Sequence, residues 1–398
     1  MKYVEHGIRY LRGQSVTEGG LDLKDELYIS TEDHDRMIRA EVIPRDVLLT
    51  IAGSIGNCCV VRGIEIANIN QAIVKIRPSV HVDSDYLSIF LNSKYGKFQT
   101  SRLANGAVQL NVNFSEVGDI KVLVPSLEIQ RSLVAEIENA RQSRKQKLAQ
   151  ADALLSSLDE YLLDQLGLNM PQKSDKKIFA MSLRKVRSAQ RIDVDYFHPE
   201  RIIAIREQED RKELHSKCLT EFVDFVRDTI SDYTSESYIG MANVQRNTGE
   251  LVESNDKESE GKSFAFIEDD ILFARLRPYL NKVYRAERTG VCSTEFHVIR
   301  IKEEYKNEIL PDYLATILRS SLILAQTKHM MTGNTHPRLA NEDVINLVVP
   351  IPELEIQERL VIEIKHRRTE VRRLRQDAET EWESAKTQFE RKLLGEEV

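Results

Sequence analysis

Apolar residues recur at alternating spacings of three and four along two long stretches of the chain. Such a pattern predicts an α-helix whose apolar stripe packs against another helix, as in a coiled coil. Neither proline nor glycine occurs in residues 127–166 or 354–394, so nothing interrupts either helix. We predict helices over residues 127–168 and 353–398 that pack against each other. The residues expected at their contact are Val134, Ile137, Leu148, Leu155, Val361, Ile364, Val371 and Trp382.

The regions before each long helix have a different pattern, in which short apolar runs are bounded by turn residues. These runs predict strands, and apolar residues at helical spacing predict short helices at 85–93 and 312–320. Each region is expected to close with a strand, at 120–124 or 344–349, that leads into the long helix. The other strands are expected at 47–51, 58–62, 72–76, 271–274, 282–285 and 296–301.

The two halves of the chain are copies of one unit. The sequence LEIQRSLVAEI that begins at Leu127 matches LEIQERLVIEI, which begins at Leu354, at eight of eleven positions and an offset of 227 residues. The same offset relates Tyr86 to Tyr313. Chance does not preserve one offset over such a distance, so we infer a duplicated module that consists of a globular head and a long helix.

This duplication predicts the domain organisation. We expect a first head at residues 1–126, a helix at 127–168, a linker at 169–178, a second head at 179–352 and a second helix at 353–398. The first head is predicted to be short at its N-terminus, because the residues that open the second head have no counterpart in it. A shortened start, a rearranged chain or a head completed by another polypeptide would each explain this. The predicted fold class is α/β (α+β), with two mixed α/β heads separated by two long helices.

Composition limits the possible functions. Of 398 residues, 41% are hydrophobic, enough for sizeable cores, and 30% are charged, which suits long exposed helices. The net charge of −7 argues against a protein that coats nucleic acid nonspecifically, but it allows local basic patches. The four cysteines lack zinc-ligand spacing, so we expect no metal site. Because the chain has no leader-like start and no run of about 20 apolar residues, we expect a cytoplasmic protein without membrane contact.

Polar loops in both heads have side chains that suit contact with double-stranded DNA. Arginine pairs with guanine, and asparagine and glutamine pair with adenine. The loops around Gly106 and Gly333 recur at matching places, although each glycine also suits a backbone turn. A solvated turn or a structural hydrogen bond is the alternative for every member of this set. The predicted DNA contacts are Arg102, Asn105, Gln109, Asn111, Arg275, Arg277, Tyr279, Lys282, Asn334, Thr335, His336 and Arg338.

Basic residues also cluster on the second long helix, between positions 365 and 375. One interpretation places them over DNA between the two heads. The other places them at an interface with a partner protein. The sequence leaves both open.

The order head, helix, head, helix, with a proline hinge before each helix, resembles the specificity subunit of type I restriction–modification systems. The resemblance is carried by VPSLEIQ from Val124 to Gln130 and VPIPELEIQ from Val349 to Gln357. It implies two target-recognition domains that each read half of a split DNA target, and two helices that form an antiparallel coiled coil. It also implies that the helices dock two modification subunits, which methylate adenine at N6, and that restriction subunits join them in phage defence.

The same resemblance implies that this chain catalyses nothing and has no catalytic residue. S-adenosylmethionine, ATP and Mg would belong to the partner subunits, so no cofactor is expected here. The residues agree, because the sequence contains neither a GxxxxGK[ST] phosphate loop nor the Asn/Asp-Pro-Pro-Tyr/Phe motif of methyltransferases. The main alternative is a coiled-coil scaffold that joins proteins without reading DNA.

Overall fold

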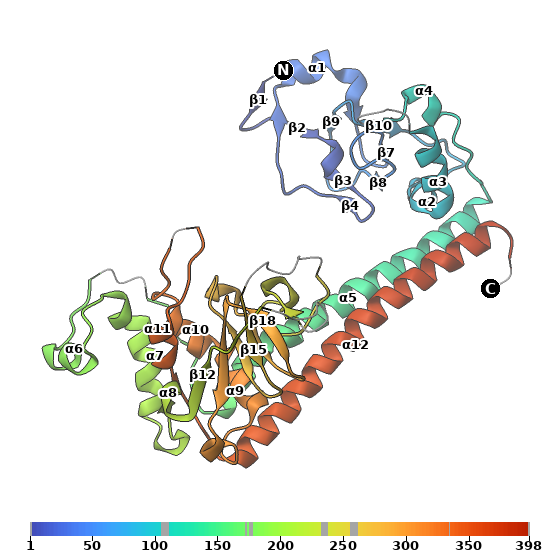
Figure 1. The fold of residues 1–398 in the computed structure, drawn as a ribbon. Coiled ribbons are helices and arrows are strands. Elements are labelled where there is room, and N and C mark those ends of the chain that lie inside the picture. The colour runs from blue at the N-terminus through green and yellow to red at the C-terminus, as the bar shows by residue number, and fades with distance from the viewer. Residues whose placement is uncertain are drawn as a thin grey trace. The chain divides into compact units, whose positions relative to one another are not determined.

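The computed structural model describes residues 2–104, 111–171, 173–174, 178–231, 238–254, 262–333 and 335–396. The chain divides into two compact units, residues 1–150 with 373–398, and residues 151–372. Each unit contains one head and a part of both long helices (Figure 1). The predicted fold class, mixed α/β heads with two long helices, is confirmed. Among the described helices, none is both long and apolar enough to cross a membrane.

The first head consists of short strands and four helices in its described residues. Its strands are β1 (Tyr3–Val4), β2 (Ile8–Leu11), β3 (Val16–Thr17), β4 (Gly20–Leu21), β5 (Tyr28–Ile29), β6 (Glu41–Val42), β7 (Val47–Thr50), β8 (Cys58–Val60), β9 (Ala67–Ile69) and β10 (Ile73–Ile76). Its helices are α1 (Thr31–Arg36), α2 (Ser84–Asn92), α3 (Lys94–Leu103) and α4 (Phe114–Val117). The sheets have the orders β1-β5-β2-β9-β6, β10-β7-β8 and β3-β4. Helix α2 packs against β7 and β8.

The second head has a similar but larger set of elements. Its strands are β11 (Lys217–Cys218), β12 (Val223–Val226), β13 (Thr229–Ile230), β14 (Tyr238–Ile239), β15 (Ser263–Phe266), β16 (Ile271–Ala274), β17 (Val283–Arg285), β18 (Gly290–Ser293), β19 (Phe296–Ile301) and β20 (Val348–Val349). Its helices are α6 (Leu183–Ala189), α7 (Pro199–Glu209), α8 (Leu219–Phe222), α9 (Pro311–Leu318), α10 (Ser321–Thr327) and α11 (Asn341–Ile345). The sheets have the orders β12-β19-β16-β17, β13-β15-β18-β14 and β11-β20.

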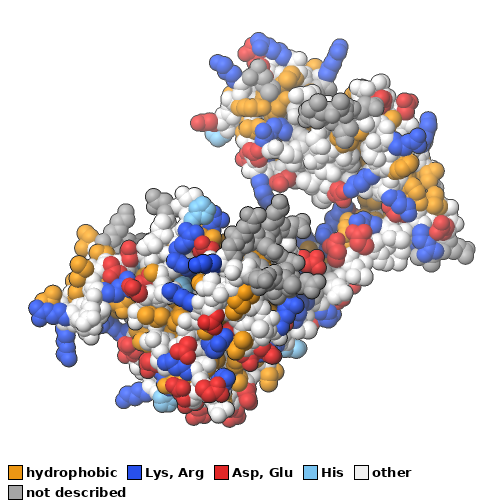
Figure 2. Space-filling model, viewed as in Figure 1, with side chains coloured by type: hydrophobic (Ala, Val, Ile, Leu, Met, Phe, Trp, Pro, Cys, Tyr) orange, Lys and Arg blue, Asp and Glu red, His pale blue; other side chains and the backbone are white. Residues whose placement is uncertain are grey.

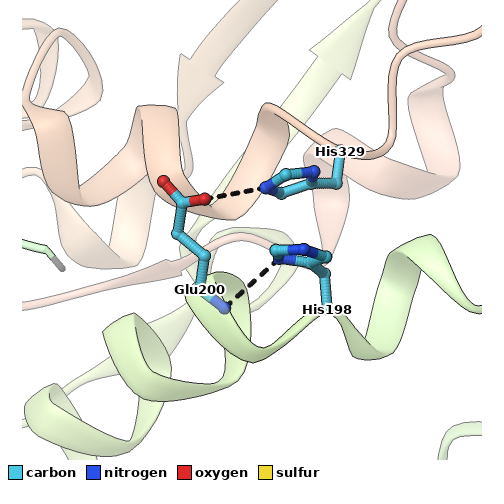
Figure 3. A group of neighbouring side chains, drawn as sticks. All are labelled: His198, Glu200 and His329. Atoms are coloured by element: carbon cyan, nitrogen blue, oxygen red, sulfur yellow. Dashed lines mark hydrogen bonds and ion pairs between the residues drawn. The ribbon is translucent and has the colours of Figure 1, made fainter. Parts of the chain in front are cut away.

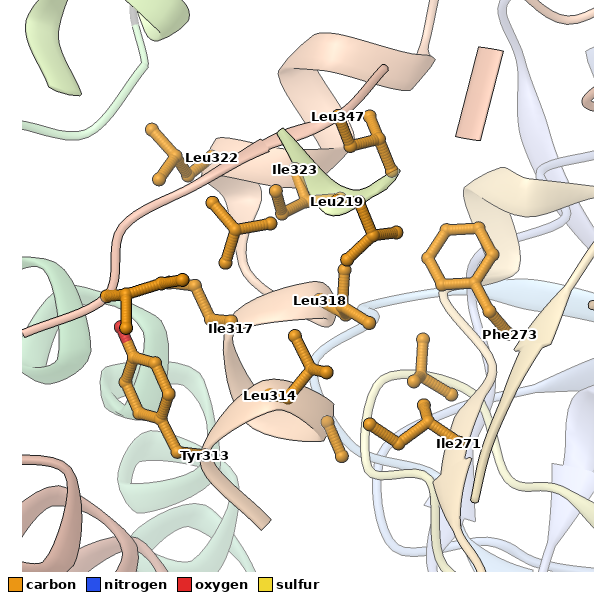
Figure 4. Close-up of a cluster of buried hydrophobic side chains, with 14 of the residues drawn as sticks. Leu219, Ile271, Phe273, Tyr313, Leu314, Ile317, Leu318, Leu322, Ile323 and Leu347 are labelled. Atoms are coloured by element: carbon orange, nitrogen blue, oxygen red, sulfur yellow. The ribbon is translucent and has the colours of Figure 1, made fainter. Parts of the chain in front are cut away.

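One central strand in each head lies between two cores, which explains its uninterrupted apolar sequence. Side chains alternate between the two faces of a strand, so a strand covered on both faces is apolar throughout. In β16, Ile271 and Phe273 join a core with α9 and α10, which Figure 4 shows, whereas Leu272 packs into a separate cluster. In the first head, Leu49 and Leu48 of β7 are divided between two clusters in the same way.

The long helices are α5 (Leu127–Gln165) and α12 (Leu354–Leu393), and they pack antiparallel within each unit. In the first unit, the Lys392 ammonium lies 2.8 Å from the Glu136 carboxylate, and Arg144 lies 2.9 Å from Glu379. As residue numbers increase along α5, the numbers of the residues that they contact in α12 decrease, so the two helices run antiparallel. In the second unit, Leu162 of α5 and Ile364 of α12 are buried in one apolar cluster.

The glutamine of each LEIQ motif fastens its helix to its head. Gln357 is completely buried, accepts a hydrogen bond from the Leu310 amide (3.0 Å) and donates to the Glu308 and Pro352 carbonyls (2.8 and 2.7 Å). Its counterpart Gln130 is also completely buried and makes the three equivalent hydrogen bonds. Burial without these bonds would be costly. The repeated motif is therefore a structural joint.

A repeated tyrosine completes this joint. The hydroxyl of Tyr86 donates to the Leu123 carbonyl at 2.6 Å, and the hydroxyl of Tyr313 donates to the Pro350 carbonyl at 2.8 Å. Both tyrosines are completely buried. Their shared offset in the sequence thus reflects one contact made twice.

The predicted closing strands are largely wrong. Residues 120–124 form no strand, and of residues 344–349 only Val348 and Val349 do so, as β20, while Val344 lies in α11. The difference between the copies has a physical cause: β20 pairs with β11, whereas no described strand pairs with residues 120–124. An apolar run becomes a strand only where a partner accepts its backbone hydrogen bonds.

Candidate nucleic-acid interface

Two loops of the second head, distant in the sequence, form one surface. The Arg277 amide donates to the Pro337 carbonyl at 2.7 Å, and the Leu339 amide donates to the Arg275 carbonyl at 3.0 Å. Leu276 and Arg338 form an antiparallel bridge between the loops. Figure 2 shows Lys and Arg side chains gathered on this end of the second head. The structure therefore brings together two groups of predicted contact residues that the sequence separates.

The first loop presents its side chains on a tightly turned backbone. Arg277 and Asn281 have φ values of 48° and 51°, which place both in the left-handed region. Asparagine tolerates this region better than arginine does, so Arg277 holds local strain. The Asn281 side chain donates to the Arg319 carbonyl at 2.6 Å and fixes the end of the turn. Tyr279, at the tip, is 50% exposed.

Of the charged residues predicted in this loop, Arg275 is exposed, whereas Lys282 is engaged elsewhere. The Lys282 ammonium donates to the Met241 carbonyl at 2.6 Å and is half-buried. It therefore supports the loop from within the head. The Arg275 amide donates to the Glu295 carbonyl, its carbonyl accepts from the Leu339 amide, and the residue is exposed.

The second loop is shaped by one glycine and one ion pair. Gly333 has a φ of 99°, and a side chain there would approach the His336 carbonyl at 3.2 Å. Arg338 donates to both carboxylate oxygens of Glu295, through Nε at 3.0 Å and Nη2 at 2.7 Å. This bidentate pair raises the pKa of Arg338 and orients the loop. Thr335 and His336 are exposed, and the predicted contact Asn334 lies outside the described residues.

Sequence reasoning missed a small polar cavity beside Arg275. It has a volume of about 160 Å³, and Arg227, Thr294 and Asn341 line it together with buried His297. Burial, followed by the charge of Arg275, lowers the pKa of His297 to about 4, so this imidazole is neutral at physiological pH. No sequence pattern indicates these residues, because they come from three separate stretches of the chain and meet only in the fold.

The first head supplies fewer residues that can be placed. Arg102 is exposed at the last turn of α3, with its guanidinium 5.7 Å from the centre of the Phe98 ring. Asn111 is exposed and forms a bridge with Ala52. The predicted contacts Asn105 and Gln109 lie outside the described residues. Of the contacts predicted in this loop, the structure therefore describes only Arg102 and Asn111.

Three side chains of the second head form the kind of donor set that can hold a metal ion, namely His198, Glu200 and His329. In Figure 3 the two imidazole rings lie stacked, with centroids 3.4 Å apart, and His329 Nε2 lies 2.8 Å from the Glu200 carboxylate. The Lys328 ammonium contacts the same carboxylate at 3.3 Å. Because Glu200 already has two partners that can balance its charge, the cluster acts in this arrangement as an ion-paired joint between α7 and the residues that directly follow α10.

Residues 218–365 match the family model for the type I restriction–modification DNA specificity domain. They extend from β11 into the first turns of α12 and contain both loops and the Gln357 joint. This part of the chain is similar to type I DNA specificity domains. Its polar loop surface is therefore the natural place to look for contacts that distinguish one DNA sequence from another.

Similarity to known proteins extends beyond this domain. The chain is 27% identical over 136 residues to the type I restriction enzyme EcoBI specificity subunit of Escherichia coli, in a match that covers 34% of this chain and 29% of that relative. A chain in a solved type I R-M system shares the fold with a TM-score of 0.58 and 14% identity, covering 98% of this chain and 91% of that chain. The resemblance to type I specificity subunits is confirmed.

The two long helices bury the predicted stripe. All eight stripe residues are buried or half-buried. In the first unit, Ile137 packs with Phe389 and Trp382, and the guanidinium groups of Arg141 and Arg144 lie 5.8 and 6.0 Å from the Trp382 ring. These two arginines therefore lie along the helix pair, with their stems over the tryptophan.

Proposed function

We propose that this chain is the DNA-specificity subunit of a type I restriction–modification complex and that each head reads one half of a split target. The observation that carries the proposal is the duplication of a whole architecture. Both heads have a three-strand core of the same order and the same glutamine joint to an antiparallel helix. A rigid spacer between two readers sets which turns of the duplex they can reach.

In this proposal the target-recognition domains comprise residues 1–126 and 179–352, a linker comprises 169–178, and the spacer helices comprise 127–168 and 353–398. Within the second domain, exposed Arg275, Tyr279, Thr335 and His336 reach DNA, while Arg338 and Lys282 hold the loops in place. Arg277 stiffens the turn that presents Tyr279.

The helices dock two modification subunits, which bind S-adenosylmethionine and methylate adenine at N6. Restriction subunits that use ATP and Mg join this assembly in the cytoplasm. Exposed basic residues on α12, such as Lys365 and Arg372, lie outside the buried stripe, where DNA or a docked subunit would compete with Asp312 and Glu250 for them.

The test is co-expression of this chain with a type I modification subunit, followed by DNA sequencing that detects N6-methyladenine. A split methylated motif that disappears when the chain is omitted would support the proposal. A stable complex that neither methylates nor binds DNA would favour the scaffold alternative. Methylation by the chain alone would contradict the assignment of catalysis to its partners.

A further inference from the structure

An apolar groove of about 470 Å³ lies on the first head. One wall is strand β10, and the other is the extended chain that leads to α5. Residues that line it include Val74, Ile76, Leu87, Phe114, Val122 and Val124. Phe114 and Val124 are 73% and 49% exposed, which is unusual for side chains of this kind so close to a core.

The second head shows what covers the equivalent groove. Its counterpart of β10 is β19, because Ile76 pairs with Val47 in one copy as Ile299 pairs with Ile271 in the other. An ion pair supports this alignment: Arg77 binds Asp46 just as Arg300 binds Asp270, with two hydrogen bonds of 2.6–2.7 Å in each copy.

Residues 217–226 of the second head fill that groove. Strand β12 pairs along β19, β11 pairs with β20, and the α8 side chains Leu219 and Phe222 between them are completely buried. Both walls of the groove are thereby completed as sheets. Ile351 is 6% exposed there, whereas its counterpart Val124 is 49% exposed.

The first head leaves both walls open. Within the described residues, β10 has a neighbouring strand on one side only, and residues 120–124 have none. The backbone edge of β10 is therefore free to accept another strand, and the apolar floor lies beside it.

Charge also favours a segment like residues 217–226 in the groove of the first head. In the second head Asp224 lies opposite Arg300 in the strand register, and the Lys302 ammonium binds the carbonyls of Thr220 and Glu221. The groove of the first head carries Lys75 and Arg77 along its rim, and the Arg77 side chain is 55% exposed. An acidic, apolar strand would complement it.

We propose that this groove binds a polypeptide segment that has the strand–helix–strand pattern of residues 217–226. One strand adds to the edge of β10, the short helix places two apolar side chains on the groove floor, and the other strand pairs with residues 120–124. The inference concerns how the first head is completed, and it holds whether or not the heads read DNA.

The test uses a fluorescent peptide with the sequence of residues 211–230, titrated with the full chain and followed by anisotropy. We expect saturable binding that is lost when Leu219 and Phe222 of the peptide are both changed to Asp. Val124→Asp in the chain should weaken binding about tenfold or more, because it places a charge in the groove at an already exposed position. Val80→Asp is the matched control, since Val80 is 84% exposed and does not line the groove.

Hydrogen exchange locates the bound peptide. Protection of residues 74–77 and 120–124 would support the proposal. Absence of binding, binding that Val124→Asp leaves unchanged, or protection confined to the second head would each overturn it. Ile76→Asp provides a second variant on the opposite wall, with retained protection of β7 as the sign that the head remains folded.

Discussion

Arg275 and Arg338 lie on neighbouring loops, yet their side chains have different environments. The Arg338 guanidinium donates to both carboxylate oxygens of Glu295. This ion pair fixes the conformation of the loop. The side chain of Arg275 reaches the surface, beside the cavity that holds His297. The fold thus places an ion-pair partner beside Arg338 and leaves Arg275 exposed.

Replacing Arg275 should therefore affect recognition more than stability. We expect Arg275→Ala to weaken specific DNA binding by about 1–3 kcal/mol in the complex with modification subunits. Arg285→Ala is the control, because Arg285 is engaged by Asp269. Titration of labelled target DNA at fixed salt measures the difference. Equal effects of the two changes would remove Arg275 from the proposed contacts.

Glu200 should make stability depend on pH. Burial raises its pKa, but hydrogen bonds from His329 and Lys328 outweigh burial, so the pKa lies below its ordinary value of 4.5. The ionised Glu200 therefore stabilises the folded state above pH 4.5, and this stabilisation is lost as the pH falls through the lowered pKa. We expect Glu200→Gln to melt at a lower temperature near neutral pH and to approach the unmodified protein in acid. Glu209→Gln, at the exposed end of α7, should show no such convergence.

At the scale of elements, the joint between head and helix is built in the same way in both copies. A buried glutamine supplies one acceptor and two donors to backbone groups that would otherwise lack partners, and it does so in both copies. The direction in which each long helix leaves its head is set there. A duplicated joint gives both heads the same local relation to the helix that follows.

Removing this side chain should loosen the joint. We expect Gln357→Ala to reduce the free energy of unfolding by about 1–3 kcal/mol, because it leaves a buried amide and two carbonyls without their partner. Gln376→Ala, at an exposed position of the same helix, should change it by less than about 0.5 kcal/mol. Urea denaturation followed by circular dichroism compares the two. Similar losses from both variants would contradict a specific role for Gln357.

At the scale of the whole molecule, two copies of one unit carry different loops on the same frame. Both copies share the order of three β-strands and the glutamine joint to the long helix. The polar residues of the loops differ between the two heads. This division suits a protein that presents two unlike reading surfaces. The net charge of −7 is compatible with DNA binding, because binding to DNA depends on local basic patches and not on the average charge.

Exchange of one head should change one half of the target. We expect a chain whose residues 218–353 are replaced by the same region of another specificity subunit to methylate a motif that differs in one half only. The spacing between the halves should stay the same, because the helices are unchanged. Sequencing of N6-methyladenine gives both quantities. A change in both halves would show that the heads are not independent readers.

Much of this architecture follows from the sequence alone. The 3,4 pattern predicts both long helices, because a helix brings every third and fourth residue to one face. The internal repeat predicts two heads, because the repeated positions include the glutamine and tyrosine that join each head to its helix. The central strands β7 and β16 are evident because a strand buried on both faces is apolar throughout. The polar loops were predictable as groups, since turns that need glycine or proline are local features.

Tertiary structure alone decided the rest. The apolar run 344–349 is partly a strand because β11 lies beside it, and the run 120–124 is not, because no described strand does. The roles of Lys282 and Arg338 are set by Met241 and Glu295, and the cavity around His297 gathers residues from distant parts of the second head. Local pattern determines which conformation a segment favours, whereas partners distant in the chain determine which hydrogen bonds and charges it satisfies.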